Sequence, residues 1–196
     1  VYDEWIVRDQ GAMVRQIGYS PKEFAQIMID KEGGLKKAKK LFDKSEIKPS
    51  DYHPEDIRIN SAGEKYSKIL NSVFEEGYDF RDYNRASNIY WPGNRLGHGR
   101  EDVAKFWNSL KNIFTEIKFS IEHVGYLDEP NKNPRASIRW FLEGMHSIDS
   151  EEYGKKTNSK LFIMGINHVE LNKDSIIREW VLFDEVAIWK QILMNK

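Results

Sequence analysis

The chain contains no cysteine, so thiolate chemistry is excluded. Histidine and carboxylate side chains are the remaining candidates for acid–base or metal chemistry. The five histidines show no His-x-His or His-x-x-x-His spacing, and zinc sites are usually built from such spacings or from cysteines. The glycine-rich stretch 93–99 (GNRLGHG) lacks the lysine and the strand-to-helix form of a phosphate-binding loop, and no Gly-x-Ser-x-Gly motif is present. We therefore expect no metal, no cofactor and no serine-hydrolase chemistry.

His146 is the candidate catalytic residue. It ends an expected strand, and alternation places it on the same face as Ile138, Trp140 and Leu142. Burial among such side chains would lower the pKa of the imidazole and leave a neutral base at physiological pH. The alternative interpretation is a strand-end histidine whose ring hydrogen-bonds a loop carbonyl.

Aromatic side chains could line an apolar cavity beside this base. The expected substrate-binding residues are Tyr90, Trp91, Phe106, Trp107, Trp140, Trp180 and His168. Aromatic residues on amphipathic elements are more often ordinary core residues, so both roles stay open for them. His168 shares its alternation set with Met164 and Ile166 but also with Glu170, which leaves its face undecided.

These side chains belong to one complete domain, which we place at residues 61–196. Two helices are expected first, at 61–76 and 100–114, with a short strand at 87–91 between them. Four strands follow, at 118–127, 135–146, 161–171 and 176–183. Helices followed by an antiparallel meander predict an α+β fold in which a curved sheet wraps on the helices.

The last strand, 176–183, is predicted to be central, because both of its alternation sets are apolar. The two sets are Ile176, Trp180 and Leu182, and Ile177, Val181 and Phe183. Asp184 follows and is expected to cap a short helix rather than act as an acid.

Residues 4–18 repeat residues 179–193. The two segments, EWIVRDQGAMVRQIG and EWVLFDEVAIWKQIL, share six identities in fifteen positions, where average composition would give about one. We expect residues 1–18 to be the last strand and helix of a preceding copy of the domain, in a tandem protein. Residues 19–60 would then be a helical connector and linker, with helices at 21–31 and 35–43 and an irregular segment at 47–60.

One face of the sheet needs a cover. If the helices pack on one side only, Ile177, Val181 and Phe183 would lie together in water on the other side, which is unfavourable. We expect a homodimer with this face at its interface, or a contact with the preceding copy.

Composition fits a single core and limits the partners. The chain has 196 residues, 40% hydrophobic and 13% aromatic, with a net charge of −1 that is dispersed along it. The sequence therefore has no concentration of positive charge that would indicate binding to nucleic acid or to an anionic membrane surface. No apolar run approaches the roughly 20 residues that cross a bilayer. No signal peptide is visible, so a cytoplasmic location is the default expectation, although a fragment that begins at Val1 would have lost such a peptide.

Four stretches of the complete domain form a recognisable set: YWPGN, GHGREDV, RWFLEGMH and GINHVELNKDSIIREWVLFDEVAIWKQI. With these stretches and this order of elements, residues 61–193 resemble the SnoaL-like polyketide cyclases of the NTF2-like superfamily. The resemblance implies an NTF2-like, cystatin-like cone in which a bent antiparallel sheet and the helices enclose one apolar pocket, usually in a homodimer.

The best-known members of that family close a ring by an intramolecular aldol reaction. The resemblance implies that His146, in GMH, corresponds to a pocket histidine in a GTH-like stretch. The cyclases also place an aspartate on the following strand, just before the glycine that corresponds to Gly165. Residues 160–164 (KLFIM) contain no carboxylate at that point.

Two functions stay open. One is a cofactor-free aldol-type cyclase, or a related isomerase, dehydratase or hydrolase, acting on a small apolar carbonyl compound. The other is a non-catalytic module that binds a hydrophobic ligand or supports assembly, and the missing aspartate favours it. An open aromatic pocket holding a titratable group would indicate the enzyme, and a pocket filled by the protein's own side chains would indicate the module.

Overall fold

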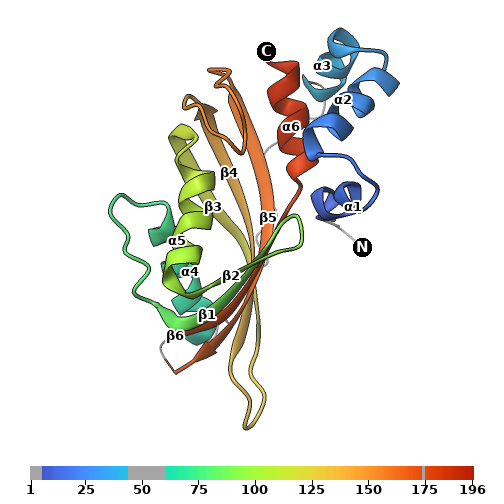
Figure 1. The fold of residues 1–196 in the computed structure, drawn as a ribbon. Coiled ribbons are helices and arrows are strands. Elements are labelled where there is room, and N and C mark those ends of the chain that lie inside the picture. Colours follow the sequence, from blue (N-terminus) through green and yellow to red (C-terminus); the bar gives the residue numbers. More distant parts are fainter. Residues whose placement is uncertain (1–5, 44–60, 174) are drawn as a thin grey trace.

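The computed structural model of the chain describes residues 6–43, 61–173 and 175–196. The expected irregular segment 47–60 lies outside these residues. The elements, in chain order, are α1 (Gln10–Gln16), α2 (Pro21–Lys31), α3 (Leu35–Asp43), α4 (Ser61–Val73), β1 (Tyr83–Trp91), β2 (Arg95–His98), α5 (Gly99–Lys111), β3 (Phe114–Leu127), β4 (Arg135–His146), β5 (Lys160–Asn172), β6 (Ser175–Phe183) and α6 (Glu185–Met194) (Figure 1).

The strands form one curved sheet in the order β2-β1-β6-β5-β4-β3. The meander from β3 to β6 is antiparallel, as the sequence predicts, and β6 is a central strand. The sheet is nevertheless mixed, because β1 pairs with β6 in parallel. The short strand β2 forms inside the glycine-rich stretch, where Gly93 and Asn94 take positive φ angles of 88° and 57° and turn the chain back onto β1.

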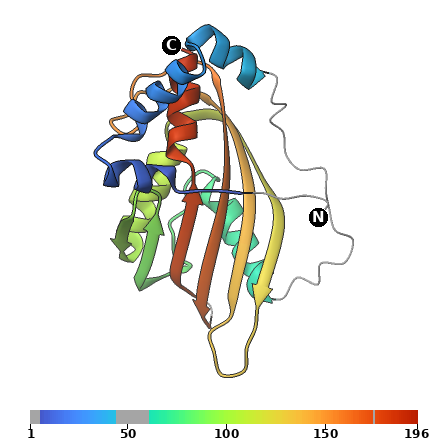
Figure 2. The same cartoon turned by 90° about the vertical axis from the view of Figure 1, so that its right-hand side faces the viewer.

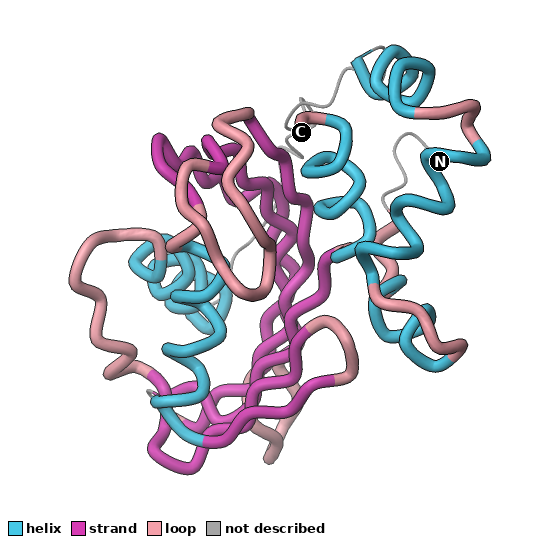
Figure 3. Tube along the Cα trace, turned by 45° about the horizontal axis from the view of Figure 1, so that its top comes forward, coloured by secondary structure: helices cyan, strands magenta, loops and turns pink. Residues whose placement is uncertain are grey.

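Helices lie on both sides of this sheet (Figure 3). The helices α4 and α5 pack on its concave face, and together with the sheet they make an α+β cone. The segment 6–43, called here the N-terminal arm, carries α1, α2 and α3 and lies on the opposite, outer side beside α6. No helix among the described residues is long and apolar enough to cross a lipid bilayer.

The faces of β6 differ from the simple alternation expected. Glu170 pairs with Arg178 whereas Leu171 pairs with Ile176, so a bulge adds one residue to β6 at this point. An extra residue reverses the faces of all the residues that follow it. Val181 and Phe183 therefore lie inside the cone, 4% and 0% exposed, and their prediction on the outer face is wrong.

The outer face is partly covered from within the chain. Residues 6–9 run across the face of the sheet before α1 begins (Figure 2). They pair with no strand, so the strand expected at residues 4–8 is not formed by its described part. The Asp9 carboxylate accepts the backbone N–H of Gly93 at 2.9 and 3.1 Å, and the Arg15 guanidinium donates to the Glu185 carboxylate at 2.6 and 3.2 Å. These contacts fix the arm to the hairpin and to α6.

A glycine in β5 makes room for the indole ring of Trp140. The indole of Trp140 lies across Gly165, where a Cβ atom would come within 2.1 Å of the ring. Gly165→Ala should therefore displace Trp140 and cost about 1–3 kcal/mol of unfolding free energy. Gly125→Ala is the matched strand control, because its Cβ would meet only the Ser137 hydroxyl, at 3.1 Å. Urea unfolding measures both, and equal costs would contradict the role of Gly165.

Candidate functional site

Among the described residues, the interior of the cone holds one buried carboxylate, that of Glu179, which is 0% exposed. The Tyr66 hydroxyl donates to Oε1 at 2.5 Å and the Tyr83 hydroxyl to Oε2 at 2.9 Å. The indole N–H of Trp107 donates to Oε2 at 3.3 Å, and the Asn167 amide donates to Oε1 at 2.9 Å. We call these five residues the Glu179 cluster. Helices α4 and α5 and strands β1, β5 and β6 each contribute one member.

Asn167 has a defined orientation in this cluster. Its Oδ1 accepts the indole N–H of Trp140 at 2.8 Å, and an indole nitrogen can only donate. The amide NH₂ must therefore face Glu179 and the Tyr66 hydroxyl, to which it donates at 2.7 Å. The side chain of Asn167 thus connects the aromatic part of the interior with the carboxylate.

Burial raises the pKa of Glu179, and the hydrogen bonds from Tyr66, Tyr83, Trp107 and Asn167 oppose that rise. The pKa values of the two tyrosines are also raised well above the ordinary value, first by burial and then by the charge of Glu179. The protons therefore stay on the phenols, which act as donors to the carboxylate.

The Glu179 cluster is saturated and closed. A carboxylate offers about four acceptor positions, and four donors occupy them. The four donor residues are all 0% exposed. A substrate could reach Glu179 only by displacing one of these donors, so the observed arrangement stabilises the cone and leaves no free base.

Aromatic rings fill the rest of the interior. Trp140 has Trp107, Phe119 and Phe183 around it, with ring centroids 6.4, 5.8 and 6.2 Å away. Trp91 stacks on Phe106 at 5.2 Å. The space in which an apolar pocket was expected is therefore occupied by the side chains of the protein itself.

His146 is buried at the far end of β4, on the inner face as predicted. The loop that follows β4 returns over it: the backbone N–H of His146 donates to the Ser159 carbonyl, and its carbonyl accepts from Thr157 and Asn158. Its Nδ1 lies 3.4 Å from the Thr157 hydroxyl, and its Nε2 has no hydrogen-bond partner among the described residues. Burial lowers the pKa of the imidazole, which is therefore neutral.

His146 and Glu179 lie at different levels along the sheet. Glu179 is level with Val169 and Ala136 in the sheet, and His146 lies ten residues further along β4 than Ala136. Ten residues of strand span about 33 Å. On β5, the residue directly before Gly165 is Met164, which faces the outer side, so no carboxylate from this strand stands beside His146.

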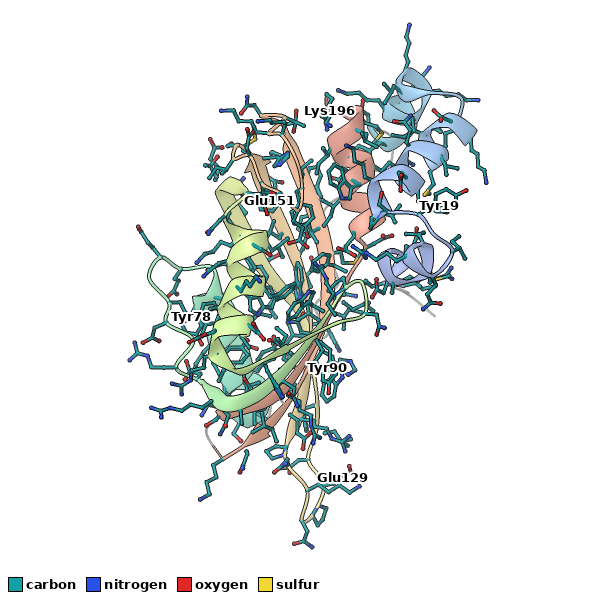
Figure 4. All side chains as sticks on the ribbon, viewed as in Figure 1. Tyr19, Tyr78, Tyr90, Glu129, Glu151 and Lys196 are labelled. Atoms are coloured by element: carbon teal, nitrogen blue, oxygen red, sulfur yellow. The ribbon has the colours of Figure 1, made fainter. Side chains whose placement is uncertain are left out.

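The seven expected substrate-binding residues fall on two sides of the sheet. Trp91, Phe106, Trp107 and Trp140 lie in the interior. Tyr90 and Trp180 are 36% and 39% exposed on the outer face, where their rings stack at 5.5 Å (Figure 4 labels Tyr90). His168 is the strand partner of Trp180 and is exposed on the same face. The structure therefore does not bring these residues into one site.

A cavity of about 680 Å³ lies on the outer side, between the sheet, α6 and the N-terminal arm. We call it the arm cavity. Apolar side chains from the arm, the sheet and α6 line it, including Val7, Met28, Phe42, Phe141, Phe162, Met164, Ile188 and Met194. A second depression, of about 810 Å³, lies further along the same face, but its lining comes from the strands alone and has no opposing wall.

Sequence reasoning missed the Glu179 cluster and the arm cavity. A signal for the first was present, because a glutamate in the middle of a strand that is apolar on both faces has to be paired or bonded. For the cavity there was no signal, because it depends on how the arm folds back. Within the described residues no three His, Asp or Glu side chains are grouped as a metal ion would require.

Solved structures with the same fold carry related names. No protein-family model matches the chain, and no curated protein matches it. A structure from Shewanella putrefaciens CN-32, provisionally named a SnoaL-like polyketide cyclase, has a TM-score of 0.56 at 16% identity, over 74% of this chain and 99% of its own.

Two further structures agree. A provisionally named polyketide cyclase from Acidithiobacillus ferrooxidans has a TM-score of 0.55 at 16% identity, over 71% of this chain and 100% of its own. IdmH from Streptomyces antibioticus, which is also provisionally named a polyketide cyclase, has a TM-score of 0.54 at 13% identity, over 68% of this chain and 99% of its own. At these identities the likeness shows a shared fold, which is the fold that the sequence predicts.

Replacing Glu179 by glutamine tests whether the cluster stabilises the cone. The amide NH₂ would face at least one obligate donor, so unfolding free energy should fall by about 1–3 kcal/mol. Because the folded-state pKa of Glu179 is raised, wild-type stability should also decrease as pH rises from about 4.5 towards that pKa. The glutamine variant should lack this decrease. Chemical unfolding over a pH series measures both effects.

The control is Glu170→Gln, on the neighbouring strand, where the carboxylate pairs with Arg178 at the surface. It should change stability by less than about 1 kcal/mol. If Glu179→Gln lowered the unfolding free energy no more than Glu170→Gln does, the cluster would have no stabilising role.

Proposed function

We propose that this chain is a non-catalytic NTF2-like module that binds a small apolar molecule in the arm cavity. The observation that carries the proposal is the position of the open space: the interior of the cone is filled, and a ligand-sized cavity lies on the outer side of the sheet. Its volume of about 680 Å³ is in the range of about 300–1,000 Å³ that small-molecule sites usually have.

The lining of the arm cavity favours an apolar ligand of variable shape. Methionines from the arm, β5 and α6 contribute, and thioether side chains adapt to irregular apolar surfaces. Phenylalanines from α3, β4 and β5 add flat surfaces.

Several polar groups of the cavity lining are already bonded within the protein. The Gln191 amide bonds the backbone of Phe162, and the Lys190 ammonium pairs with the Glu32 carboxylate at 2.5 Å. The Asp184 carboxylate caps α6 by accepting the N–H groups of Val186 and Ala187. Bonded groups add little to the recognition of a polar ligand. The ligand class that we propose is therefore a mainly apolar small molecule.

A second candidate is the cofactor-free aldol-type cyclisation that the resemblance implies. One observation favours it: His146 is a buried neutral base with an unpartnered Nε2. This function requires the loop of residues 147–159 or the aromatic rings to move, because the interior is closed in the observed state. The absence of the aspartate before Gly165 weighs against it.

Met164→Glu tests the arm cavity. A carboxylate introduced among apolar side chains should weaken the binding of a neutral fluorescent probe, N-phenyl-1-naphthylamine, by about tenfold or more, since tenfold corresponds to about 1.4 kcal/mol. Ile166→Glu is the matched control, two residues along on the same face of β5 but outside the cavity lining. Fluorescence titration and a thermal scan of each folded variant give the result. Equal weakening in both variants, or no probe binding to the wild type, would contradict the proposal.

His146→Gln separates the two candidates. Because the folded-state pKa of His146 is lowered, its contribution to stability is lost as pH falls from about 6.5 towards that lower pKa, where only the unfolded chain takes up the proton. The variant should lose less stability than the wild type between about pH 7 and pH 5. Probe binding should not change. Turnover of an apolar dicarbonyl compound by the wild type, lost in His146→Gln, would instead support the cyclase.

A further inference from the structure

Helix α1 and the residues before it present a bare apolar face. Met13 and Ile17 are 62% and 66% exposed and lie one helical turn apart. Ile6, before the helix, is 61% exposed and also lies at the edge of the arm cavity. Exposed apolar groups on one face of a helix usually mark a surface that another part of the protein covers. The sequence repeat identifies what that surface is built to contact.

The counterparts of these residues in the repeat are core residues. Residues 6, 13 and 17 align with Val181, Ile188 and Ile192, which are 4%, 1% and 0% exposed. All three counterparts belong to the main core cluster of the cone. The face that α6 turns to its own cone is therefore the face that α1 leaves bare.

A glutamine also has a bonded position in α6 and an exposed counterpart in α1. In α6 the Gln191 amide accepts the N–H of Phe162 at 2.9 Å and donates to the Phe162 carbonyl at 2.9 Å, so it takes the place of a strand partner on β5 beyond the end of β6. Gln16 is its counterpart in α1 and is exposed. The α1 face thus carries both the apolar residues and the amide that close a cone in the second copy.

The N-terminal caps of the two helices also correspond. Asp9 caps α1 through the N–H of Ala12, and Asp184 caps α6 through the N–H of its counterpart Ala187. The two helices therefore begin in the same way, as expected for two copies of one strand-to-helix unit.

We infer that the bare face of α1 is the closing face of a second NTF2-like copy, which precedes this one in the same polypeptide. The partner is a cone whose own last strand and helix include residues 6–17. Arg8 stands where Phe183 is buried in the second copy, so the interior of the preceding copy differs at this position. The inference does not depend on ligand binding.

Thiol labelling tests this arrangement cleanly, because the chain has no cysteine of its own. Met13→Cys is placed in the 196-residue chain and in the product of the coding sequence extended upstream to its start. In the 196-residue chain the thiol should react with a maleimide rapidly. In the extended product the reaction should be slower by about tenfold or more, because covered groups react only after opening. Leu127→Cys, 48% exposed on the distant β3–β4 hairpin, should react at the same rate in both.

A second variant reports on the strand contact. Gln16→Ala should lower the unfolding midpoint of the extended product and leave that of the 196-residue chain unchanged. An upstream sequence that encodes no second copy of the fold, or an unchanged labelling rate at position 13, would overturn the inference. Protection of position 13 in the 196-residue chain that grows with protein concentration would also overturn it, since a second molecule of this chain would then be the cover.

Discussion

The carboxylate of Glu179 is fully buried, so its hydrogen bonds must all come from the protein. An unpaired charge in such surroundings is among the most costly features a fold can carry. Four donors from four other elements converge on it, which fixes α4, α5, β1 and β5 relative to β6. The bulge in β6 contributes as well, because it turns Glu179 inwards and Trp180 outwards.

Much of the fold follows from sequence pattern alone. The boundaries of β4 were predicted to the residue, and those of β5 and β6 to one residue, because alternation and turn residues agree there. The inner positions of Trp140 and His146 follow from the same alternation. The strand β2 and the parallel pairing of β1 with β6 are not predicted, because glycines interrupt the pattern of β2 and pairing between distant strands leaves no local signal. The predicted faces of β6 are reversed, because a bulge leaves no mark in composition.

The site was less accessible to such reasoning. A strand pattern gives the face of a residue but not which residues from other elements meet it, so Tyr66, Tyr83 and Asn167 could not be assigned to Glu179 in advance. Aromatic residues were expected to surround a pocket, and in the structure they fill it. The difference between lining and filling depends on ring orientation, which spacing along the chain does not determine. The arm cavity depends on tertiary packing of α2, α3 and α6 and was invisible for the same reason.

The side chain of Gln191 has a consequence for how the chain behaves when its C-terminus is damaged. Where β6 ends, β5 continues with unpaired backbone groups, and an open strand edge of this kind recruits other strands and leads to aggregation. The glutamine amide occupies this edge at Phe162. A chain cleaved inside α6 would therefore lose more than a helix. It would expose an unpaired edge of β5, and we expect it to aggregate rather than persist as a shortened, folded domain.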